Sequence, residues 1–371
     1  MNSWLSLRRW LAVALTFVAL QVTIASGAQR WQIARAPYRF VFPRDHFAHD
    51  TYRTEWWYFT GHLHAADGRH YGFEVTFFRI GLRPHPYRVH PGRSAWRIAQ
   101  FYLAHFAITD ITGHRFLYAE STARDALGQG YASQRRLLVR VNRWVLSGTS
   151  SLEPRMQLRA ADRASAIDLR VVPEKPPVIE GRDGISRKGA CASCASHYYS
   201  FTRLRASGTL REGGRTERVT GVAWMDHEYG SDELSPRKVG WDWFSIQLDD
   251  DREIMLYRLR ERNGKTTPAS SGTLVAPNGR PSYLSLRDFQ IAPTGYWRSP
   301  HTHARYPSGW IVRVAGIATP LRLVPVLKDQ ELVGAGATYW EGAVRVFDAR
   351  TGRRLGQGYV ELTGYAGKIA L

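Results

Sequence analysis

Trp56-Trp-Tyr-Phe-Thr-Gly-His-Leu63 recurs in a related form as Trp241-Asp-Trp-Phe-Ser-Ile-Gln-Leu248. Each copy precedes a turn and a second strand-like segment. A repeat at this separation indicates two copies of one structural module. The polar stretch 231–239 between them is typical of a linker, so we expect modules at residues 36–235 and 236–371.

Alternating hydrophobicity predicts that these modules are built from β-strands. The residues Tyr71, Phe73, Val75 and Phe77 occupy every second position, which is the pattern of a half-buried strand. Turn pairs such as Asn263-Gly264 separate strand-like segments at hairpin spacing. Further strands are expected at 101–109, 137–145, 166–172, 198–204, 254–259, 308–314 and 358–362. The sequence therefore predicts an all-β fold with antiparallel strands, closed into barrels or sandwiches so that edges are removed.

The first 28 residues have the composition of a secretory signal peptide. Arg8 and Arg9 precede an apolar run that ends in small residues at Ala28. The alternative is a membrane anchor, but the apolar core is shorter than the span of about 20 residues that a bilayer needs. We expect cleavage after Ala28 and a periplasmic or secreted mature protein.

The chain is strongly basic, with 51 Lys and Arg against 32 Asp and Glu. Removal of residues 1–28 takes away two Arg and leaves a net charge of +17. Such a charge suits peripheral contact with an anionic membrane, or an acidic partner. The arginines are scattered among strand residues without a nucleic-acid motif, so no nucleic-acid partner is predicted.

Cys191 and Cys194 are the two cysteines of the chain. In an oxidising compartment they favour a local disulfide over a free pair, and over metal or redox chemistry. They lie in a polar segment from Glu174 to Ser196 that interrupts the first module. This segment is either a lid or an insertion.

Common catalytic and cofactor motifs are missing, including the nucleophile elbow, phosphate-binding loops and zinc-protease helices. Two histidine pairs at period two, His62 with His64 and His301 with His303, each lack a visible third ligand. No metal and no cofactor are predicted.

The densest group of reactive side chains is Trp224-Met-Asp-His-Glu-Tyr-Gly230, followed by Trp241-Asp-Trp243. An acid such as Asp226 or Glu228 in an aromatic pocket would have a raised pKa and could donate a proton, with His227 as a relay. Trp and Tyr faces could stabilise a carbocation. The alternative is a strand end whose acids cap turns and whose rings fill the core.

At these residues the chain resembles the carotenoid 1,2-hydratase (hydroxyneurosporene synthase) superfamily, and within it the secreted, lipocalin-like AttH branch. The similar segments are 55–63, 226–230, 241–244, 339–343 and 358–364. The resemblance extends from about Ala36 to the C-terminus and implies two tandem lipocalin-like (calycin) antiparallel β-barrels.

The resemblance also implies acid-catalysed, cofactor-independent addition of water to a C=C bond. His227 and Tyr229 match residues of the hydratase motif. At the position of Tyr229 the hydratases carry Trp. Tyr257 matches a downstream tyrosine, and Leu259 stands where the family has an acid.

We therefore expect an exported lipocalin-like protein that binds an apolar or amphipathic small molecule, such as a lipid or isoprenoid, with hydratase-like (carbon–oxygen lyase) or hydrolase-like catalysis. The alternative is a non-catalytic accessory protein of an envelope ABC-type permease. The site is expected in the first barrel. Its expected catalytic residues are Asp226, His227, Glu228, Tyr229 and Tyr257, and its ligand-binding residues are Trp56, Trp57, Tyr58, Trp224, Trp241, Asp242 and Trp243.

Overall fold

The computed structural model describes residues 30–84, 98–231 and 238–367. Within these ranges the structure is built from β-strands, with one short 3₁₀ turn, η1 (Arg44–His46), as the helical element. No helix of the described residues has the length and apolar character needed to cross a membrane. The signal peptide predicted at 1–28 lies outside the described residues and stays a prediction.

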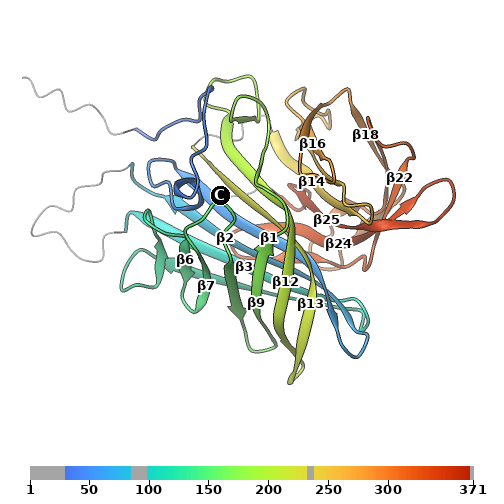
Figure 1. The fold of residues 1–371 in the computed structure, drawn as a ribbon, viewed down its shortest axis with the longest axis horizontal. Helices are drawn as coiled ribbons and strands as arrows, with labels where there is room; N and C mark the ends of the chain where they lie inside the picture. Colours follow the sequence, from blue (N-terminus) through green and yellow to red (C-terminus); the bar gives the residue numbers. More distant parts are fainter. Residues whose placement is uncertain (1–29, 85–97, 232–237, 368–371) are drawn as a thin grey trace, which may run out of the picture. The chain divides into compact units, whose positions relative to one another are not determined.

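The first sheet is antiparallel and contains thirteen strands (Figure 1). The two ends of the sheet approach each other, so that it nearly closes into a barrel; Asn142, in the turn after β6, donates to the backbone oxygen of Thr122 on β4 over 3.0 Å. In spatial order the strands are β4 (Arg115–Arg124), β3 (Gln100–Asp110), β2 (His70–Gly81), β1 (Thr54–Ala65), β13 (Arg215–Gly230), β12 (Ala195–Glu212), β9 (Ser165–Pro173), β8 (Met156–Ala161), β7 (Trp144–Gly148), β6 (Leu138–Val141) and β5 (Gly130–Ala132), with β10 (Val178–Ile179) and β11 (Ser186–Arg187) paired to β12.

The second sheet is a ten-stranded antiparallel barrel, also nearly closed. Its order is β17 (Pro281–Ser285), β16 (Ser271–Val275), β15 (Glu253–Glu261), β14 (Lys238–Leu248), β25 (Arg354–Thr363), β24 (Thr338–Asp348), β22 (Leu321–Pro325), β21 (Trp310–Val314) and β18 (Phe289–Pro293), with β23 (Glu331–Val333) paired to β24. The hairpin of β19 (Tyr296–Arg298) and β20 (Arg305–Pro307) is separate. The predicted fold class, two tandem antiparallel barrels, is confirmed. The domain boundary at 235/236 falls in residues that the structure does not describe and stays a prediction.

The internal repeat corresponds to equivalent strands of the two barrels. β1, which contains Trp56–Leu63, pairs with the next strand β2 and with the late strand β13. β14, which contains Trp241–Leu248, likewise pairs with β15 and with the last strand β25. The repeated sequence therefore forms the strand at which each sheet joins its early and late segments.

The single strand predicted at 137–145 is wrong in its extent. The segment 137–145 forms two strands, β6 and β7, joined by a tight turn at Asn142 and Arg143. Asn142 has φ of 54°, a left-handed conformation that asparagine tolerates better than most residues. The turn contains no Gly or Pro, so the sequence carries no turn signal there and the strand pattern runs through it.

Apolar side chains fill both barrels, and a further buried cluster lies between them. Trp57 and Phe59 lie in the core of the first barrel, and Phe244 and Trp310 lie in the core of the second. A third buried cluster joins the outer faces of the two sheets, and it includes Tyr58, Trp224, Trp243, Tyr257 and Tyr359. Strands that face a barrel interior on one side and the other barrel on the opposite side are therefore buried on both faces.

The polar segment 174–196 packs against the second sheet. Lys175 makes an ion pair with Glu253 on β15, with Nζ and Oε2 2.8 Å apart. Ser186 lies 3.0 Å from the hydroxyl group of Tyr257, also on β15. The segment thus belongs to the contact between the barrels, and its two cysteines, Cys191 and Cys194, are joined as a disulfide with Cα atoms 5.1 Å apart.

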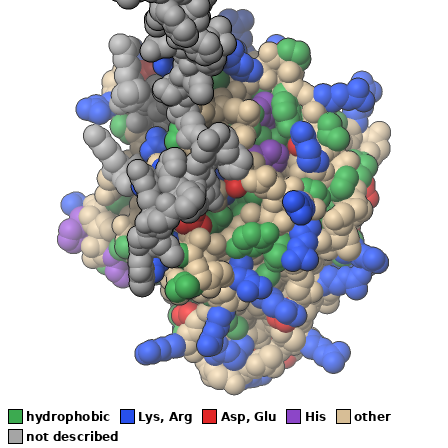
Figure 2. Space-filling model, turned by 90° about the vertical axis from the view of Figure 1, so that its left-hand side faces the viewer, with side chains coloured by type: hydrophobic (Ala, Val, Ile, Leu, Met, Phe, Trp, Pro, Cys, Tyr) green, Lys and Arg blue, Asp and Glu red, His purple; other side chains and the backbone are tan. Residues whose placement is uncertain are grey.

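The basic side chains are distributed over the surface. Figure 2 shows Lys and Arg side chains spread across the viewed face, among hydrophobic and uncharged polar groups. Exposed arginines such as Arg287, Arg313 and Arg350 are part of this distribution.

Candidate functional site

Strand alternation divides the Trp224–Gly230 segment into two groups. Successive side chains of a strand point to opposite faces, and this segment is the end of β13. Asp226 and Glu228 face the second barrel, whereas His227 and Tyr229 face the interior of the first barrel. Residues that are adjacent in sequence therefore belong to two different sites.

A cavity of about 300 Å³ lies between the two barrels. This volume is at the lower end of the range for small-molecule sites. The predicted site was expected inside the first barrel, and the structure places the cavity outside it because core side chains fill the barrel interior. The cavity is lined from the first half by Arg53, Thr54, Trp56, Tyr58, Thr76, Phe78, Lys188, Tyr198, Asp226, Glu228 and Ser231, and from the second by Trp241, Trp243, Tyr257, Leu259 and Glu361.

Asp226 is a buried carboxyl group at the wall of this cavity. It accepts hydrogen bonds from the hydroxyl groups of Tyr198 at 2.7 Å and Ser200 at 2.6 Å, and from the indole N–H of Trp224 at 2.7 Å. Burial raises the pKa of Asp226 to about 7, although these three donors act in the opposite direction. Three donors to one carboxyl group favour the ionised form.

Glu361 is a second carboxyl group of the same cavity. The indole N–H of Trp241 donates to its Oε2 over 2.7 Å. Burial raises the pKa of Glu361 to about 7, and the negative charges of Asp226 and Glu228 add to the increase. The side chain is partly accessible because it faces the cavity.

Two more buried acids, Glu341 and Glu74, lie near Glu361 at the contact between the barrels. Glu341 accepts a hydrogen bond from Tyr58 at 2.9 Å, and Glu74 accepts one from Thr76. Burial raises the pKa of Glu74 to about 8 and that of Glu341 well above its usual value, with neighbouring carboxylates contributing. The contact between the barrels therefore holds a group of acids that favour their protonated forms.

Sequence reasoning missed the roles of Glu341 and Glu361. Both lie in segments that carried the family resemblance, 339–343 and 358–364, so a signal was present. An isolated Glu on an alternating strand is normally a solvent-facing residue, which is why neither was singled out.

Glu228 occupies the part of the cavity covered by the 174–196 segment. Its Oε1 lies 2.8 Å from Nζ of Lys188, and Ser196 donates a hydrogen bond to it. The ammonium group of Lys188 lies 4.5 Å from the ring centre of Tyr257 and 5.2 Å from that of Tyr198. One end of the cavity therefore combines an ion pair with aromatic faces.

Of the other expected site residues, most line the cavity, one contacts Asp226 from behind the cavity wall, and the rest lie away from the cavity. Trp56, Tyr58, Trp241, Trp243 and Tyr257 line the cavity, and Leu259 lies beside Tyr257. Trp224 supports Asp226 from the buried cluster behind it.

Two of the expected ligand-binding residues, Asp242 and Trp57, lie elsewhere, and so does His62, for which no site was predicted. Asp242 is paired with Arg258 and Arg260 on the opposite face of β14. Trp57 stacks on His227 in the first barrel, with ring centres 4.7 Å apart. His62, from the first of the two histidine pairs, donates to the backbone oxygen of Gly358 over 3.0 Å.

The comparisons with known proteins agree on the fold. The sequence matches the family model described as AttH-like over residues 33–365. The structure resembles a crystal structure of an AttH protein from Nitrosomonas europaea with a TM-score of 0.81 and 32% sequence identity, over 90% of this chain and 99% of that one.

A more distant resemblance is to kievitone hydratase from Nectria haematococca, with a TM-score of 0.66 and 14% identity, over 91% of this chain and 97% of that one. At this level of identity the similarity concerns the fold alone. None of the curated proteins matches the chain.

Proposed function

The chain belongs to the AttH-like family, as its sequence predicted, and from the acids in its inter-barrel cavity we propose that it binds an apolar or amphipathic small molecule and hydrates an isolated C=C bond of that molecule. The observation that carries this proposal is the presence of two carboxyl groups, Asp226 and Glu361, in one aromatic-lined cavity.

The proposed ligand follows from the lining of the cavity. Trp56, Trp241 and Trp243 offer flat apolar surfaces that suit an unsaturated hydrocarbon such as an isoprenoid segment. Lys188 and Glu228 suit a polar group at one end of the ligand. The volume of about 300 Å³ accommodates a small molecule or one end of a longer chain.

The acid and base roles follow from the hydrogen bonds. Glu361 accepts a bond from Trp241 and is partly accessible, so it carries the transferable proton. Burial raises the pKa of both carboxyl groups to about 7, but Asp226 accepts three hydrogen bonds and Glu361 accepts one, so we assign Asp226 as the base of the pair. This reverses the role that sequence reasoning gave to Asp226, which was that of proton donor.

The reaction is a proton addition followed by a water addition. Glu361 transfers its proton to one alkene carbon, the π electrons form the C–H bond, and the neighbouring carbon becomes a carbocation facing the tryptophan rings. Water attacks this carbon to form the C–O bond, and Asp226 takes the proton that the water loses. Proton exchange through water then restores both carboxyl groups, so that the net change is the addition of one water without a cofactor.

Kievitone hydratase shares this fold, which is compatible with hydration but transfers no residue roles. The proposal also includes export, which the N-terminal sequence predicts.

The test begins with native mass spectrometry of the full chain purified from its own cell envelope. A retained adduct of small-molecule size supports binding and identifies the ligand. Turnover of that ligand in isotopically labelled water should place the label in a new hydroxyl group. A clean apo mass with a co-purifying membrane permease would instead support the accessory role, and release of an acid and an alcohol from an ester would support a hydrolase.

A further inference from the structure

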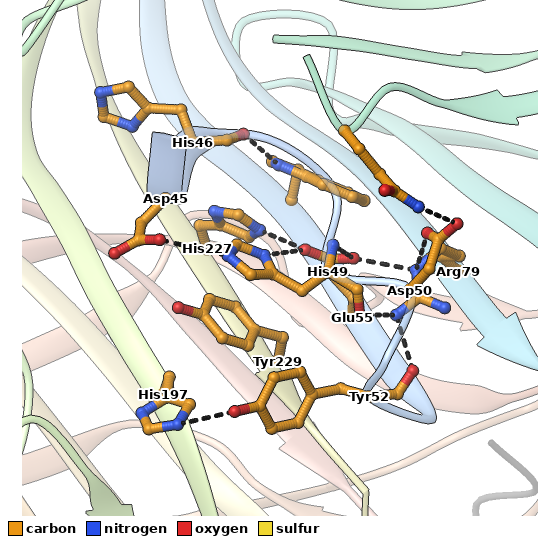
Figure 3. A network of polar contacts seen from close by, with 12 residues as sticks. Asp45, His46, His49, Asp50, Tyr52, Glu55, Arg79, His197, His227 and Tyr229 are labelled. Carbon is orange, nitrogen blue, oxygen red and sulfur yellow. Dashed lines mark hydrogen bonds and ion pairs between the residues drawn. The ribbon is translucent and has the colours of Figure 1, made fainter. Parts of the chain in front are cut away.

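Three side chains that could bind a metal ion point toward one another inside the first barrel (Figure 3). His49 precedes β1, Glu55 lies on β1, and His227 lies on β13. Oε1 of Glu55 is 2.8 Å from Nδ1 of His49 and 2.9 Å from Nε2 of His227. All three atoms lie within 4.8 Å of one another, on the opposite side of β13 from the cavity described above.

The two imidazole rings are held in place by stacking. His49 stacks on Tyr229 with ring centres 3.6 Å apart, and His227 stacks on Trp57 at 4.7 Å. The ring nitrogens that point away from Glu55 also have partners. Nε2 of His49 lies 3.5 Å from Asp45, and Nδ1 of His227 lies 3.2 Å from the hydroxyl group of Tyr199. Such outer contacts commonly orient histidine ligands of metal ions.

The two carboxylate oxygens of Glu55 have different partners. Oε1 faces the two histidine rings, and Oε2 binds Arg79 and a backbone N–H. Oε2 accepts hydrogen bonds from Nε of Arg79 and from the backbone N–H of His49, both at 2.9 Å. Glu55 and Arg79 are fully buried, and this ion pair favours the ionised form of the carboxyl group. Oε1 is thus an anionic oxygen held between two imidazole nitrogens.

A chain of hydrogen bonds fixes the tautomer of His227. Nε2 of His46 lies 3.1 Å from the backbone oxygens of Ser151 and Leu152, so it carries a proton, and Nδ1 of His46 must accept. The partner of this Nδ1 is the hydroxyl group of Tyr199 at 2.7 Å, which donates its one proton there.

The oxygen of Tyr199 can then only accept from Nδ1 of His227. In the neutral ring, Nε2 of His227 consequently presents a lone pair to Oε1 of Glu55. These two atoms are 2.9 Å apart, and their lone pairs repel each other unless a cation lies between them.

We propose that a divalent transition-metal ion, with Zn²⁺ as the best fit, binds to Nδ1 of His49, Oε1 of Glu55 and Nε2 of His227. Two imidazole nitrogens and one carboxylate oxygen form a common zinc ligand set, and they do not suit Ca²⁺ or Mg²⁺, which prefer oxygen ligands. The sequence predicted no metal because His49, Glu55 and His227 have no motif spacing. The ion ties the turn before β1 to β13, independently of the hydration proposed above.

The test uses the full mature chain without a polyhistidine tag. After incubation with Zn²⁺ and dialysis, elemental analysis should find about one ion per chain. Treatment with a chelator should lower the melting temperature, and added Zn²⁺ should restore it. A chain that holds no stoichiometric ion and shows no thermal shift with Zn²⁺ would overturn the proposal and leave a shared proton as the cation between Glu55 and His227.

His49→Ala is the informative variant because His49 is the least buried of the three ligands. We expect its affinity for Zn²⁺ to fall by about 100-fold or more. The matched control is His301→Ala, which removes an exposed histidine and should keep the wild-type affinity. Equal affinity in His49→Ala and wild type would overturn the proposal.

The visible spectrum of the Co²⁺-loaded wild type provides a measurement that does not depend on the folding of any variant. A spectrum of protein-bound Co²⁺ with nitrogen ligands supports the site. A spectrum identical to that of the aqueous ion contradicts it.

Discussion

Trp241 donates its indole N–H to Glu361 over 2.7 Å, from β14 to the adjacent strand β25. This bond holds the carboxyl group that we assign as proton donor against an aromatic wall.

Glu361→Gln keeps the shape of the side chain and removes the transferable proton. Hydration should fall by about 100-fold or more, since general acid catalysis contributes on that scale. Turnover of the identified ligand measures this loss, and circular dichroism checks that the variant is folded. The matched control is Glu174→Gln on the surface, and equal activity of wild type and Glu361→Gln would refute the assignment.

The activity should fall as the pH rises above neutrality. The pKa of Glu361 is raised to about 7, so the carboxyl group loses its proton as the pH passes through this value. A profile of kcat/KM against pH should therefore decrease above about pH 7. An activity that stays constant from pH 7 to about pH 9 would contradict a carboxylic acid as the donor.

Asp226→Asn should reduce hydration by about 100-fold or more without unfolding the protein. The amide oxygen can accept from Ser200 and Trp224, and the amide N–H₂ can donate to the hydroxyl oxygen of Tyr198. The melting temperature should therefore change little. If Asp226 were only a structural cap, the same change would lower the melting temperature, and ligand affinity would fall only with the folded fraction.

His227→Ala should have the opposite profile to Asp226→Asn. His227 lies on the other face of β13 and contacts Glu55, so its loss leaves a buried carboxylate with one partner fewer. We expect a loss of stability of about 3 kcal/mol and little change in ligand affinity of the folded fraction. Chemical denaturation and ligand titration of the two variants side by side separate these effects. A loss of affinity with unchanged stability would place His227 at the ligand.

Glu180 should make the protein less stable as the pH rises. Its carboxyl group is fully buried beside Thr273, and burial raises its folded pKa to about 8, above the usual value of 4.5. The stabilising contribution of the protonated form is fully present below about pH 4.5 and is lost as the pH rises through about 8. Glu180→Gln should therefore stabilise the protein by an amount on the order of 2 kcal/mol at pH 9 and change little at pH 5. Urea denaturation at the two pH values measures the difference, and a gain of equal size at both would exclude this cause.

Cys191 and Cys194 should resist alkylation in protein isolated from the periplasm without reductant. The intact mass should show no added alkyl groups until a reductant is present. Since only three positions separate the cysteines, their loop-closure entropy is small, and Cys191→Ser should cost at most about 2 kcal/mol. Two freely alkylated thiols would contradict the prediction.

The strands could be predicted from sequence because alternation is a local property. The pattern from Tyr71 to Phe77 lies within β2, and the two copies of the repeat lie on β1 and β14. The face that each residue occupies could not be predicted. Most of β1 and the second half of β13 are buried on both sides, so apolar, aromatic and charged residues occur on both faces, and nothing in the pattern shows which side meets the other barrel.

The candidate site was predicted only in part for the same reason. The sequence indicates Asp226 and Glu228 because acids beside tryptophans are unusual, and it joins His227 and Tyr229 to them through proximity in sequence and through the family resemblance. Glu361 reaches the site through the pairing of β14 with β25, and Glu341 through a contact with Tyr58 of the other sheet; both contacts connect residues more than a hundred positions apart, which no local pattern contains.

The cavity has one wall on each barrel. If the proposed ligand binds there, the cooperativity of unfolding should depend on that ligand. The proposed ligand would touch Asp226 and Tyr198 on one side of the cavity and Trp241 and Trp243 on the other. Its binding free energy therefore adds to the attraction between the two halves of the chain. With saturating ligand, the halves should unfold in one transition, and with decreasing ligand the transition should broaden toward two. The proposed binding thus makes the coupling between the two halves a quantity that the concentration of the small molecule would control.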